Sequence, residues 1–472
     1  MRKFLFIVFV SFQMVQAQQV QWASKLIKFS SDLGGKQNGV KRILGRPDAF
    51  PQGGSSPNAW CPKDALKGRD YVEVGFEKPQ SVKQVAIFEN LNAGCVSQIM
   101  VDTGSGKYET VWARKRDWKT PTFKATIPAD HNYYFKRKRR KIQEAPDVIN
   151  PGVENAILDN AISNVVAVRV EFNFALLPGQ KQVDAIGISD SELPIQAQIN
   201  TITTYENLGT STLVSFGAIE VSTPTLSKNG NELCFTDNGQ DKEQIYVSTK
   251  EANGKWGEPI LQTALNENEM YNYIEYFGND FMLRGGSEYQ KGAGETGFAF
   301  LDKTNEGYTN PKKIKIAAYN NYDDTADATI TADKKVLILG IETDFTQGGA
   351  DLYFTNAKED GTYGLLQNMG KNINSAADEI TPQLLSDTKT LLFSSNGYSS
   401  YGDYDIFVTH RLDDTWKKWS EPVNLGSKIN GENFEASPYY DEQNEVLYYT
   451  KSIEGRSSLY SIKISKLELM QL

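Results

Sequence analysis

An internal repeat with a period of about 50 residues constrains the fold of this chain more than any other feature. Four segments align, each reading as a strand, a polar turn and a second apolar strand, and they begin at Thr223, Ala328, Thr381 and Ser437. A second motif follows each copy, at 244–247, 350–354, 404–408 and 458–461. A repeat of this length with about four strands is typical of a β-propeller blade.

The repeat also indicates how many blades there are and how the ring closes. Residues 271–321 hold a degenerate copy, which gives five blades, with six as the alternative. The last copy stops after its third strand, near Ile464, while a stray Glu206-Asn-Leu-Gly209 matches the closing motif at 424–426. We therefore expect residues near 200–210 to supply the outer strand of the last blade, because such a clasp hides edges that promote aggregation.

The part of the chain before residue 190 has a different pattern. Short alternating apolar runs at 72–76, 85–88 and 166–172 are bounded by Gly, Pro, Asn and Asp, as the strands of a β-sandwich are. Tyr and Phe, with 23 residues each, also favour strands. We expect an all-β protein with the following parts: a sandwich over 18–190 with a basic insertion near 133–160, a propeller over 195–465, and a tail over 466–472.

The first residues indicate export. Arg2 and Lys3 precede a short apolar run at 4–10, and a cleavage site ends at Ala17, so residues 1–17 are expected to be a secretory signal peptide. No later segment is long and apolar enough to span a bilayer, so we expect a periplasmic or outer-membrane-associated protein. The formal net charge of −9 makes the chain a poor general binder of nucleic acid.

The chain has three cysteines, and export permits a disulfide. Cys61 and Cys95 both fall in the N-terminal half, so they are the expected pair, although their positions in the sequence do not report the distance between them. Cys234 lies in an apolar, strand-like run, which favours a buried free thiol that packs as a small hydrophobic side chain.

The repeat motifs resemble those of the TolB-like propeller of secreted bacterial proteins. The unit at 381–430 matches best, from Pro382 through Asp405-Ile-Phe407 to Asn430, although Thr388 stands where glycine is usual. The resemblance implies a binding scaffold at the outer membrane or in the periplasm.

The N-terminal part resembles a discoidin-like jelly roll in the stretches 43–48, 57–60 and 183–189. Together the two resemblances cover about 22–465 and imply a protein of the Bacteroidetes cell-envelope type, in which a jelly roll precedes the propeller. Relatives of this type often carry an OmpA-type peptidoglycan-binding domain, which we do not expect after the last blade here.

Catalytic motifs are scarce. The two histidines are His131 and His410, which are too far apart in the sequence to form a zinc site of the His-Glu-x-x-His type. Both are expected to have surface or capping roles. Gly292-Ala-Gly-Glu-Thr-Gly297 matches the dinucleotide fingerprint, but a strand-like run follows it where that fingerprint needs a helix, so we expect a hairpin loop. Some five-bladed propellers are glycosidases, which need two carboxylates. The candidates are Asp323, Asp324, Asp403 and Asp405.

Asp405 recurs in the repeat as Asp351, before the same strand of another blade. Repetition favours a structural turn that each blade makes, because catalysis needs two dissimilar carboxylates at one place. We therefore expect no catalytic residue and no converging carboxylates in the central channel. We also expect Asp405→Asn to cost about 1 kcal/mol of stability.

Other residues are candidates for binding. Tyr398 and Tyr401 share a loop, where they can stack on a ligand or pack on the neighbouring blade. The basic run can bind an anionic partner, although a solvated loop is the interpretation we favour; it consists of Lys136, Arg137, Lys138, Arg139, Arg140 and Lys141. The discoidin-like resemblance implies a structural Ca²⁺, for which Asp48 is the candidate, and no other cofactor is expected.

These observations together predict a non-enzymatic scaffold or protein-binding module of an outer-membrane or secretion-associated assembly, with an envelope protein as its partner. The alternatives are carbohydrate binding by the jelly roll and a glycosidase on the propeller. Converging carboxylates in a deep channel would favour the enzyme. An aromatic platform on the jelly roll would favour sugar binding, and a broad, shallow, mixed surface would favour protein binding.

Overall fold

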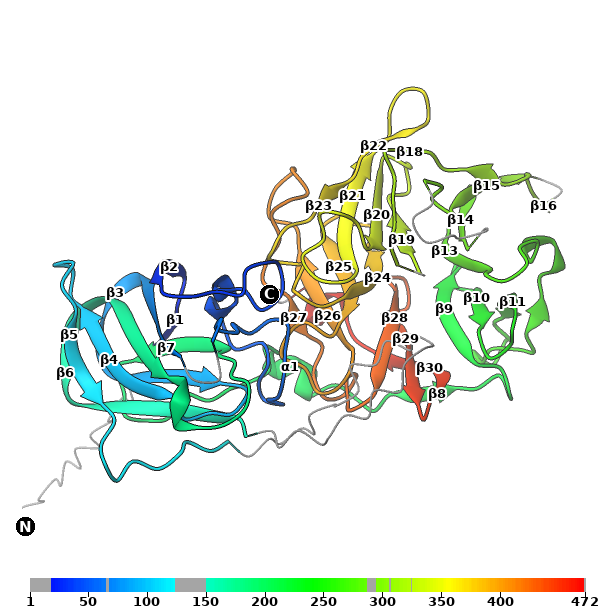
Figure 1. Cartoon of the computed structure of the whole chain (residues 1–472). Helices are drawn as coiled ribbons and strands as arrows, with labels where there is room; N and C mark the ends of the chain where they lie inside the picture. The colour runs from blue at the N-terminus through cyan, green and yellow to red at the C-terminus, as the bar shows by residue number, and fades with distance from the viewer. Residues whose placement is uncertain are drawn as a thin grey trace, which may run out of the picture.

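The computed structural model describes residues 18–64, 68–123, 150–286, 294–304, 307–323 and 325–470. The expected signal peptide (1–17) and the basic run from Lys136 to Lys141 lie outside these residues. The described chain forms a strand-rich N-terminal unit and a ring of five sheets, which lie side by side in Figure 1. Among the described helices, none is both long and apolar enough to cross a membrane.

The N-terminal unit is one antiparallel sheet of seven strands in the order β1-β7-β3-β6-β4-β5, with β2 beside β3. Its strands are β1 (Val20–Trp22), β2 (Lys25–Phe29), β3 (Arg69–Glu89), β4 (Val96–Asp102), β5 (Glu109–Ala113), β6 (Gly152–Asn173) and β7 (Ala185–Ser189). Two short 3-10 helices lie in its connections, η1 (Val40–Ile43) and η2 (Phe174–Leu176).

The long antiparallel pair of β3 and β6 folds this sheet over onto itself. Its register shifts between Gly75 and Gln84, and there the neighbour of β3 changes from β2 to β7. Val74 from the first part of β3 and Ile87 from its last part therefore meet in one buried core, together with Trp60. The two halves of the bent sheet face each other like the layers of a sandwich, while the jelly-roll connectivity stays a prediction.

The propeller has five blades, which confirms the count from the repeat and excludes six. Blade 1 consists of β9 (Val221–Leu226), β10 (Glu232–Asp237), β11 (Gln244–Thr249) and β12 (Ile260–Leu261). Blade 2 is the degenerate copy and consists of β13 (Tyr273–Phe277), β14 (Phe281–Gly285), β15 (Ala299–Thr304), β16 (Gly307–Tyr308) and β17 (Lys312–Lys313). Blade 3 consists of β19 (Asp327–Ile330), β20 (Val336–Ile341), β21 (Asp351–Asn356) and β23 (Gln367–Asn368).

Blade 4 consists of β24 (Glu379–Leu384), β25 (Thr390–Ser395), β26 (Asp405–His410) and β27 (Val423–Asn424). Blade 5 consists of β28 (Phe434–Asp441), β29 (Val446–Ile453), β30 (Arg456–Lys463) and β8 (Thr212–Val214). The remaining elements are β18 (Ile316–Ala317) paired in parallel with β22 (Tyr363–Leu365), η3 (Thr263–Leu265), α1 (Thr203–Glu206) and α2 (Lys466–Leu469). The inner strands β9, β13, β19, β24 and β28 contact one another in turn around the channel.

The ring closes slightly later in the sequence than expected. The strand that completes blade 5 is β8, which pairs with β30, so residues 200–210 do not form it. Instead, Asn200 accepts a hydrogen bond from the Asn424 N–H at 2.8 Å, which attaches this segment to blade 4. Tyr205 and Leu208 are buried in the core between blades 4 and 5, so the Asn-Leu-Gly similarity marks an apolar anchor rather than a strand.

The N-terminal unit docks on the face of the propeller where the inner strands begin. The Asn58 side chain donates to Gly397 O at 2.8 Å and accepts from the Ala376 N–H at 2.7 Å, and it is 2% exposed. The Gln52 amide donates to Gly402 O at 2.8 Å. In Figure 1 the loop around η1, coloured dark blue, reaches the blades that carry these groups. The two units therefore meet through buried, satisfied polar contacts.

Candidate functional site

Asp405 begins β26 and holds the loop before that strand. Its Oδ2 accepts hydrogen bonds from the Tyr401 N–H at 2.7 Å and from the Asn424 side-chain amide at 2.6 Å. Asn430 completes the arrangement, since its side chain donates to Asn424 Oδ1 at 2.8 Å and accepts from the Ile406 N–H at 2.9 Å. Asp405 thus ties the loop before β26 to the outer strand of its own blade.

Blade 3 repeats this arrangement. Asp351 Oδ2 accepts from the Gln347 N–H at 2.7 Å and from the Asn368 amide at 2.7 Å, and Asn374 donates to Asn368 Oδ1 at 3.0 Å. Burial raises the pKa of Asp351 to about 6 and that of Asp405 to about 8. These matching contacts in two blades support the structural turn that the sequence predicts for both aspartates.

The two tyrosines of the loop before β26 have different surroundings. Tyr398 packs with its ring centroid 5.2 Å from that of Phe407, and its hydroxyl donates to Ile373 O. This corresponds to the packing alternative rather than to a stacking platform. The Tyr401 hydroxyl instead donates to Glu206 Oε1 at 3.1 Å, at the edge of an open groove.

Hydrogen bonds between neighbouring inner strands join the blades at one level of the channel. Thr381 Oγ1 accepts from the Ser437 N–H at 3.1 Å, and Asp327 Oδ2 accepts from the Thr381 N–H at 3.1 Å. Glu275 Oε1 accepts from the Ala328 N–H at 3.1 Å. Each of these side chains thus links its blade to the next one along the chain.

Glu275 and Asp327 use carboxylates for the same kind of bond that Thr381 makes with a hydroxyl. Burial raises the pKa of both, that of Asp327 to about 6, and the charge of Asp327 raises the pKa of Glu275 further. Burial also raises the pKa of the nearby Glu243 to about 7. Because a hydroxyl makes this bond without burying a charge, ring closure alone does not explain the two carboxylates. The pair is therefore a candidate acid–base site.

This pair corrects the expectation that the channel lacks converging carboxylates. The repeat alignment begins this copy at Ala328 and so leaves Asp327 just outside it; only the hydrogen bonds show that Asp327 takes the place of Thr381 in its blade. Glu275 lies in the degenerate copy, which does not align, so the alignment holds no signal for it either. A bulge in β13 at Glu275 turns its side chain out of the regular pairing.

The other carboxylates that the sequence suggests for catalysis are Asp323, Asp324 and Asp403. The charge of Asp323 adds to the raised pKa of Asp327, so Asp323 lies near the channel pair. Asp403 raises the pKa of Glu435 slightly, in blade 5. Asp324 lies outside the described residues.

Asp48, the candidate calcium ligand, is half-buried beside a second aspartate, Asp184, which is fully buried. Asp184 accepts hydrogen bonds from the N–H groups of Asp48 at 3.1 Å and Ala49 at 3.0 Å. Burial raises the pKa of Asp48 to about 7, and the charge of Arg42 acts in the opposite direction. In the parts of the chain that the structure describes, no three His, Cys, Asp or Glu side chains are placed to hold a metal ion, so Asp48 belongs to no such group.

All three cysteines are buried free thiols, so the expected disulfide between Cys61 and Cys95 is wrong. The Gln180 amide donates to Cys61 Sγ at 2.6 Å, while Cys95 packs in the core of the N-terminal unit. Burial raises the pKa of Cys95 and of Cys234 to about 12, which keeps both protonated at neutral pH. Cys234 packs in the core between blades 1 and 2, as the sequence predicts.

An open groove of about 780 Å³ lies where the N-terminal unit, the linker and blades 4 and 5 meet. We call it the junction groove. Its walls come from Pro51, from linker and α1 residues within 197–206, from Tyr401, and from residues within 427–432. Apolar and polar groups share this lining, and the sequence held no motif for it because the walls come from distant parts of the chain.

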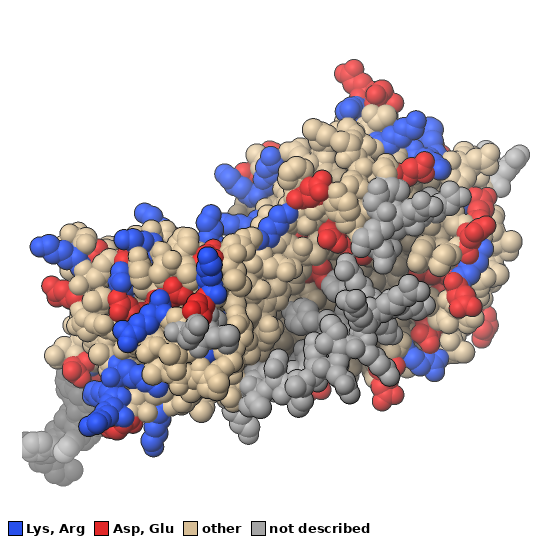
Figure 2. All heavy atoms as spheres, in the orientation of Figure 1, with Lys and Arg blue, Asp and Glu red and all other residues tan. Residues whose placement is uncertain are grey.

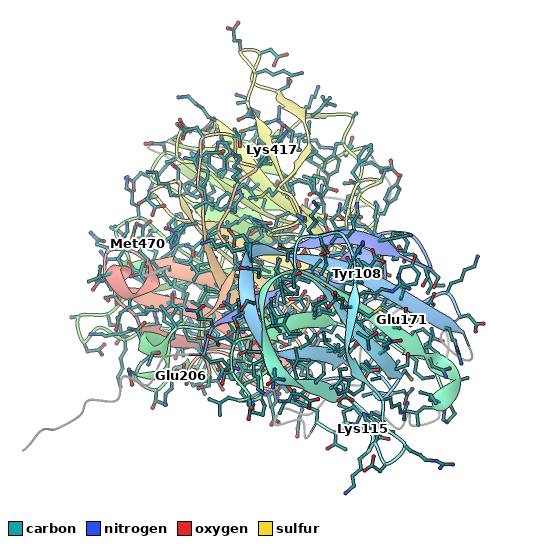
Figure 3. All side chains as sticks on the ribbon, turned by 90° about the vertical axis from the view of Figure 1, so that its left-hand side faces the viewer. Tyr108, Lys115, Glu171, Glu206, Lys417 and Met470 are labelled. Atoms are coloured by element: carbon teal, nitrogen blue, oxygen red, sulfur yellow. The ribbon has the colours of Figure 1, made fainter. Side chains whose placement is uncertain are left out.

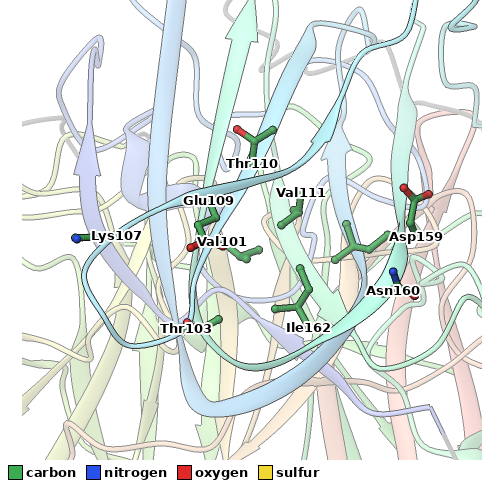
Figure 4. A pocket seen from close by; sticks show the side chains of 10 residues that line it. Val101, Thr103, Lys107, Glu109, Thr110, Val111, Asp159, Asn160 and Ile162 are labelled. Atoms are coloured by element: carbon green, nitrogen blue, oxygen red, sulfur yellow. The ribbon is translucent and has the colours of Figure 1, made fainter.

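The N-terminal unit has a smaller cavity of about 320 Å³ between β4, β5 and β6 (Figure 4). Val101, Val111 and Ile162 give it apolar walls, and charged or polar side chains such as Lys107 and Asp159 line its rim. No aromatic side chain is among its lining residues in the described chain, so this cavity does not provide the platform that sugar binding by the N-terminal unit would need.

A second hollow on the N-terminal unit, of about 420 Å³, is built around Arg169. The guanidinium stacks over the Tyr71 ring at 3.7 Å and forms ion pairs with Glu73 and Glu171, both at 2.8 Å. Figure 3 shows the surface where Glu171 and the neighbouring Tyr108 lie. Arg169 is thus already paired with two carboxylates, so its guanidinium is not free to hold an anionic ligand.

Comparisons with known proteins find similar folds only. No protein-family model matches the sequence, and no curated protein matches it. An endo-arabinase from Bacteroides thetaiotaomicron is 16% identical with a TM-score of 0.38, over 54% of this chain and 96% of that one. TolB from Acinetobacter baumannii is 11% identical with a TM-score of 0.33, over 52% and 55%. An α-L-arabinofuranosidase from Lactobacillus brevis is 12% identical with a TM-score of 0.34, over 53% and 93%. Similarity at this level carries no argument about activity.

Proposed function

We propose that this protein is an exported, non-catalytic binding module that holds a segment of another envelope protein in the junction groove. The observation that carries the proposal is the groove itself, which is open, has a volume of about 780 Å³ and has mixed walls. Enclosed and mostly apolar pockets suit small molecules, whereas an open groove with polar and apolar walls suits a few residues of an extended chain.

The way the two units dock supports this proposal. Pro51 from the N-terminal unit and Tyr401 from blade 4 line the same groove. Gln52, next to Pro51, is bonded to Gly402, next to Tyr401, so the two walls are held together by a direct contact. A groove whose walls are fixed in advance needs less ordering when a partner binds, which strengthens binding.

Export to the cell envelope is part of the proposal and rests on the sequence of residues 1–17, which lie outside the described part of the chain. The basic start, the apolar run and the cleavage site at Ala17 support it.

A photo-crosslinking amino acid at Gln198, which is exposed and lines the groove, is expected to give a specific adduct with one envelope protein in native cells. The matched control carries the same amino acid at Leu412, which is 65% exposed on the far side of blade 4. The adduct should form only from Gln198, because only that position faces the partner. The proposal fails if both positions give the same adducts, or if Gln198 gives none while the protein is folded and exported.

A second candidate function is glycoside hydrolysis in the channel, and the pair of Glu275 and Asp327 favours it. Such hydrolysis requires two neighbouring carboxyl groups, one protonated and one ionised. The pKa values of Glu275 and Asp327 are both raised, which favours a protonated member in this pair. Against this, Glu275 and Asp327 each accept a backbone N–H of the next blade, as Thr381 does, so both also serve ring closure.

A further inference from the structure

The next inference rests on the function proposed above and concerns the chemistry of the partner. We infer that the junction groove takes a basic segment, rich in lysine or arginine. The charged side chains that line it are Glu206 and Glu432, and among its described lining residues there is no Lys or Arg. A groove with charges of one sign favours a segment of the opposite sign and disfavours acidic ones.

Glu206 is held ready to accept a cation. Its carboxylate accepts hydrogen bonds from the Ser427 hydroxyl at 2.7 Å and from the Tyr401 hydroxyl at 3.1 Å. Burial alone would raise its pKa, but these bonds and the charge of Lys428 outweigh burial, so the pKa of Glu206 lies below its usual value. The carboxylate therefore stays ionised at neutral pH and is fixed in direction before a partner arrives.

The remaining walls suit the long stems of basic side chains. Ile199, Ile202 and Tyr401 line the groove near Glu206 and are partly buried. Lysine and arginine cover apolar surface with their methylene groups while the charged end reaches a carboxylate, and their cations also favour the face of an aromatic ring. Apolar walls with carboxylates at the rim therefore match both parts of a basic side chain.

Figure 2 shows acidic and basic side chains interspersed over most of the visible face, with acidic ones more frequent toward its right-hand end. The net charge of −9 attracts cations in general, but that attraction does not select a place on the surface. The junction groove combines carboxylates with apolar walls, and this combination selects a basic side chain over a cation alone.

The test is fluorescence anisotropy with labelled oligolysine, oligoglutamate and neutral oligoserine peptides on the purified full chain. Oligolysine should bind best, and its affinity should fall as salt rises. The double variant Glu206→Gln and Glu432→Gln should weaken oligolysine binding about fivefold or more, in line with two exposed ion pairs. The control Glu359→Gln removes an identical charge from an exposed turn of blade 3 and should leave binding unchanged. Melting temperatures within a few degrees of the wild type ensure that all variants are folded.

Equal binding of the three peptides, or an equal loss in the double variant and in Glu359→Gln, would overturn the inference. So would an absence of oligolysine binding. These outcomes are distinct from a failure of the proposed function: a specific adduct at Gln198 without oligolysine binding means that the groove has a partner whose segment is not basic. Gln198→Trp, which places a bulky ring in the groove without changing its charge, should also weaken oligolysine binding if the peptide lies there.

Discussion

Replacing Asp405 with alanine is expected to lower the free energy of unfolding by about 3 kcal/mol. The Tyr401 N–H and the Asn424 amide both lose their acceptor, and each buried donor left without one costs about 1–3 kcal/mol. Urea denaturation followed by tryptophan fluorescence measures the effect as a lower midpoint with an unchanged slope. Asp351→Ala should have an effect of similar size, because Asp351 accepts the same two kinds of bond.

Two further variants test whether the loss comes from these bonds. Asp405→Asn should cost only about 1 kcal/mol, because the amide oxygen can still accept from both donors. Asp241→Ala removes an exposed carboxyl that accepts none of these bonds and should change stability by less than about 0.5 kcal/mol. If Asp405→Ala leaves stability unchanged but abolishes partner binding, the residue belongs to a binding site and the structural account is wrong.

The protein is expected to melt several degrees lower at pH 8 than at pH 5. In the unfolded chain aspartate titrates near pH 4, whereas burial raises the pKa of Asp48 to about 7 and that of Asp405 to about 8. Between these values the folded protein keeps protons that the unfolded chain has released. The free energy of unfolding therefore falls as the pH rises, and it levels off above about pH 8.

The size of this effect follows from the same shifts, since one pKa unit corresponds to about 1.4 kcal/mol. Two such groups imply a loss of several kcal/mol across the range, and Glu89, whose pKa burial raises to about 7, adds to it. His410 acts in the opposite direction, because burial lowers its pKa and its contribution is lost as the pH falls below about 6.5. Between pH 5 and pH 8 the buried carboxyl groups therefore outweigh the opposing effect of His410 on stability.

Thermal melts at constant ionic strength between pH 5 and pH 8 measure this dependence. Asp405→Asn removes one titrating group and should flatten the curve of melting temperature against pH, whereas Asp241→Asn, at an exposed position, should not. A melting temperature that rises steadily from pH 5 to pH 8 would show that the buried carboxyls are ionised in the folded protein.

How much of this structure the sequence could predict depends on whether the signal is local. The blades were predictable because each repeats a local pattern, and the contacts of Asp351 and Asp405 follow from the same repetition. The strand that closes the ring lies a few residues after the segment that the sequence predicts. Asn207-Leu208-Gly209 resembles a closing motif, but Tyr205 and Leu208 are buried and anchor this segment between blades 4 and 5. Similarity of sequence does not distinguish an anchor from a strand.

Features that depend on long-range contacts were not predictable. The expected pairing of Cys61 and Cys95 rested on their shared half of the chain, which does not specify a distance. The carboxylates Glu275 and Asp327 come together only because blades 2 and 3 are neighbours in the ring. The junction groove combines Pro51 with Tyr401, and only the docking of the two units brings them together.

The most direct test of the central claim, that the partner binds in the junction groove and not in the channel, compares two variants in one binding measurement. Gln198→Trp obstructs part of the groove, and Asp327→Asn removes a channel carboxylate while keeping an oxygen that can accept the Thr381 N–H. With the partner identified by crosslinking, the account predicts that Gln198→Trp weakens binding by about tenfold or more and that Asp327→Asn leaves it unchanged. It also predicts that neither the wild type nor the variants release sugar from polysaccharides such as arabinan. Full binding by Gln198→Trp, together with loss of binding or of glycan hydrolysis in Asp327→Asn, would contradict it.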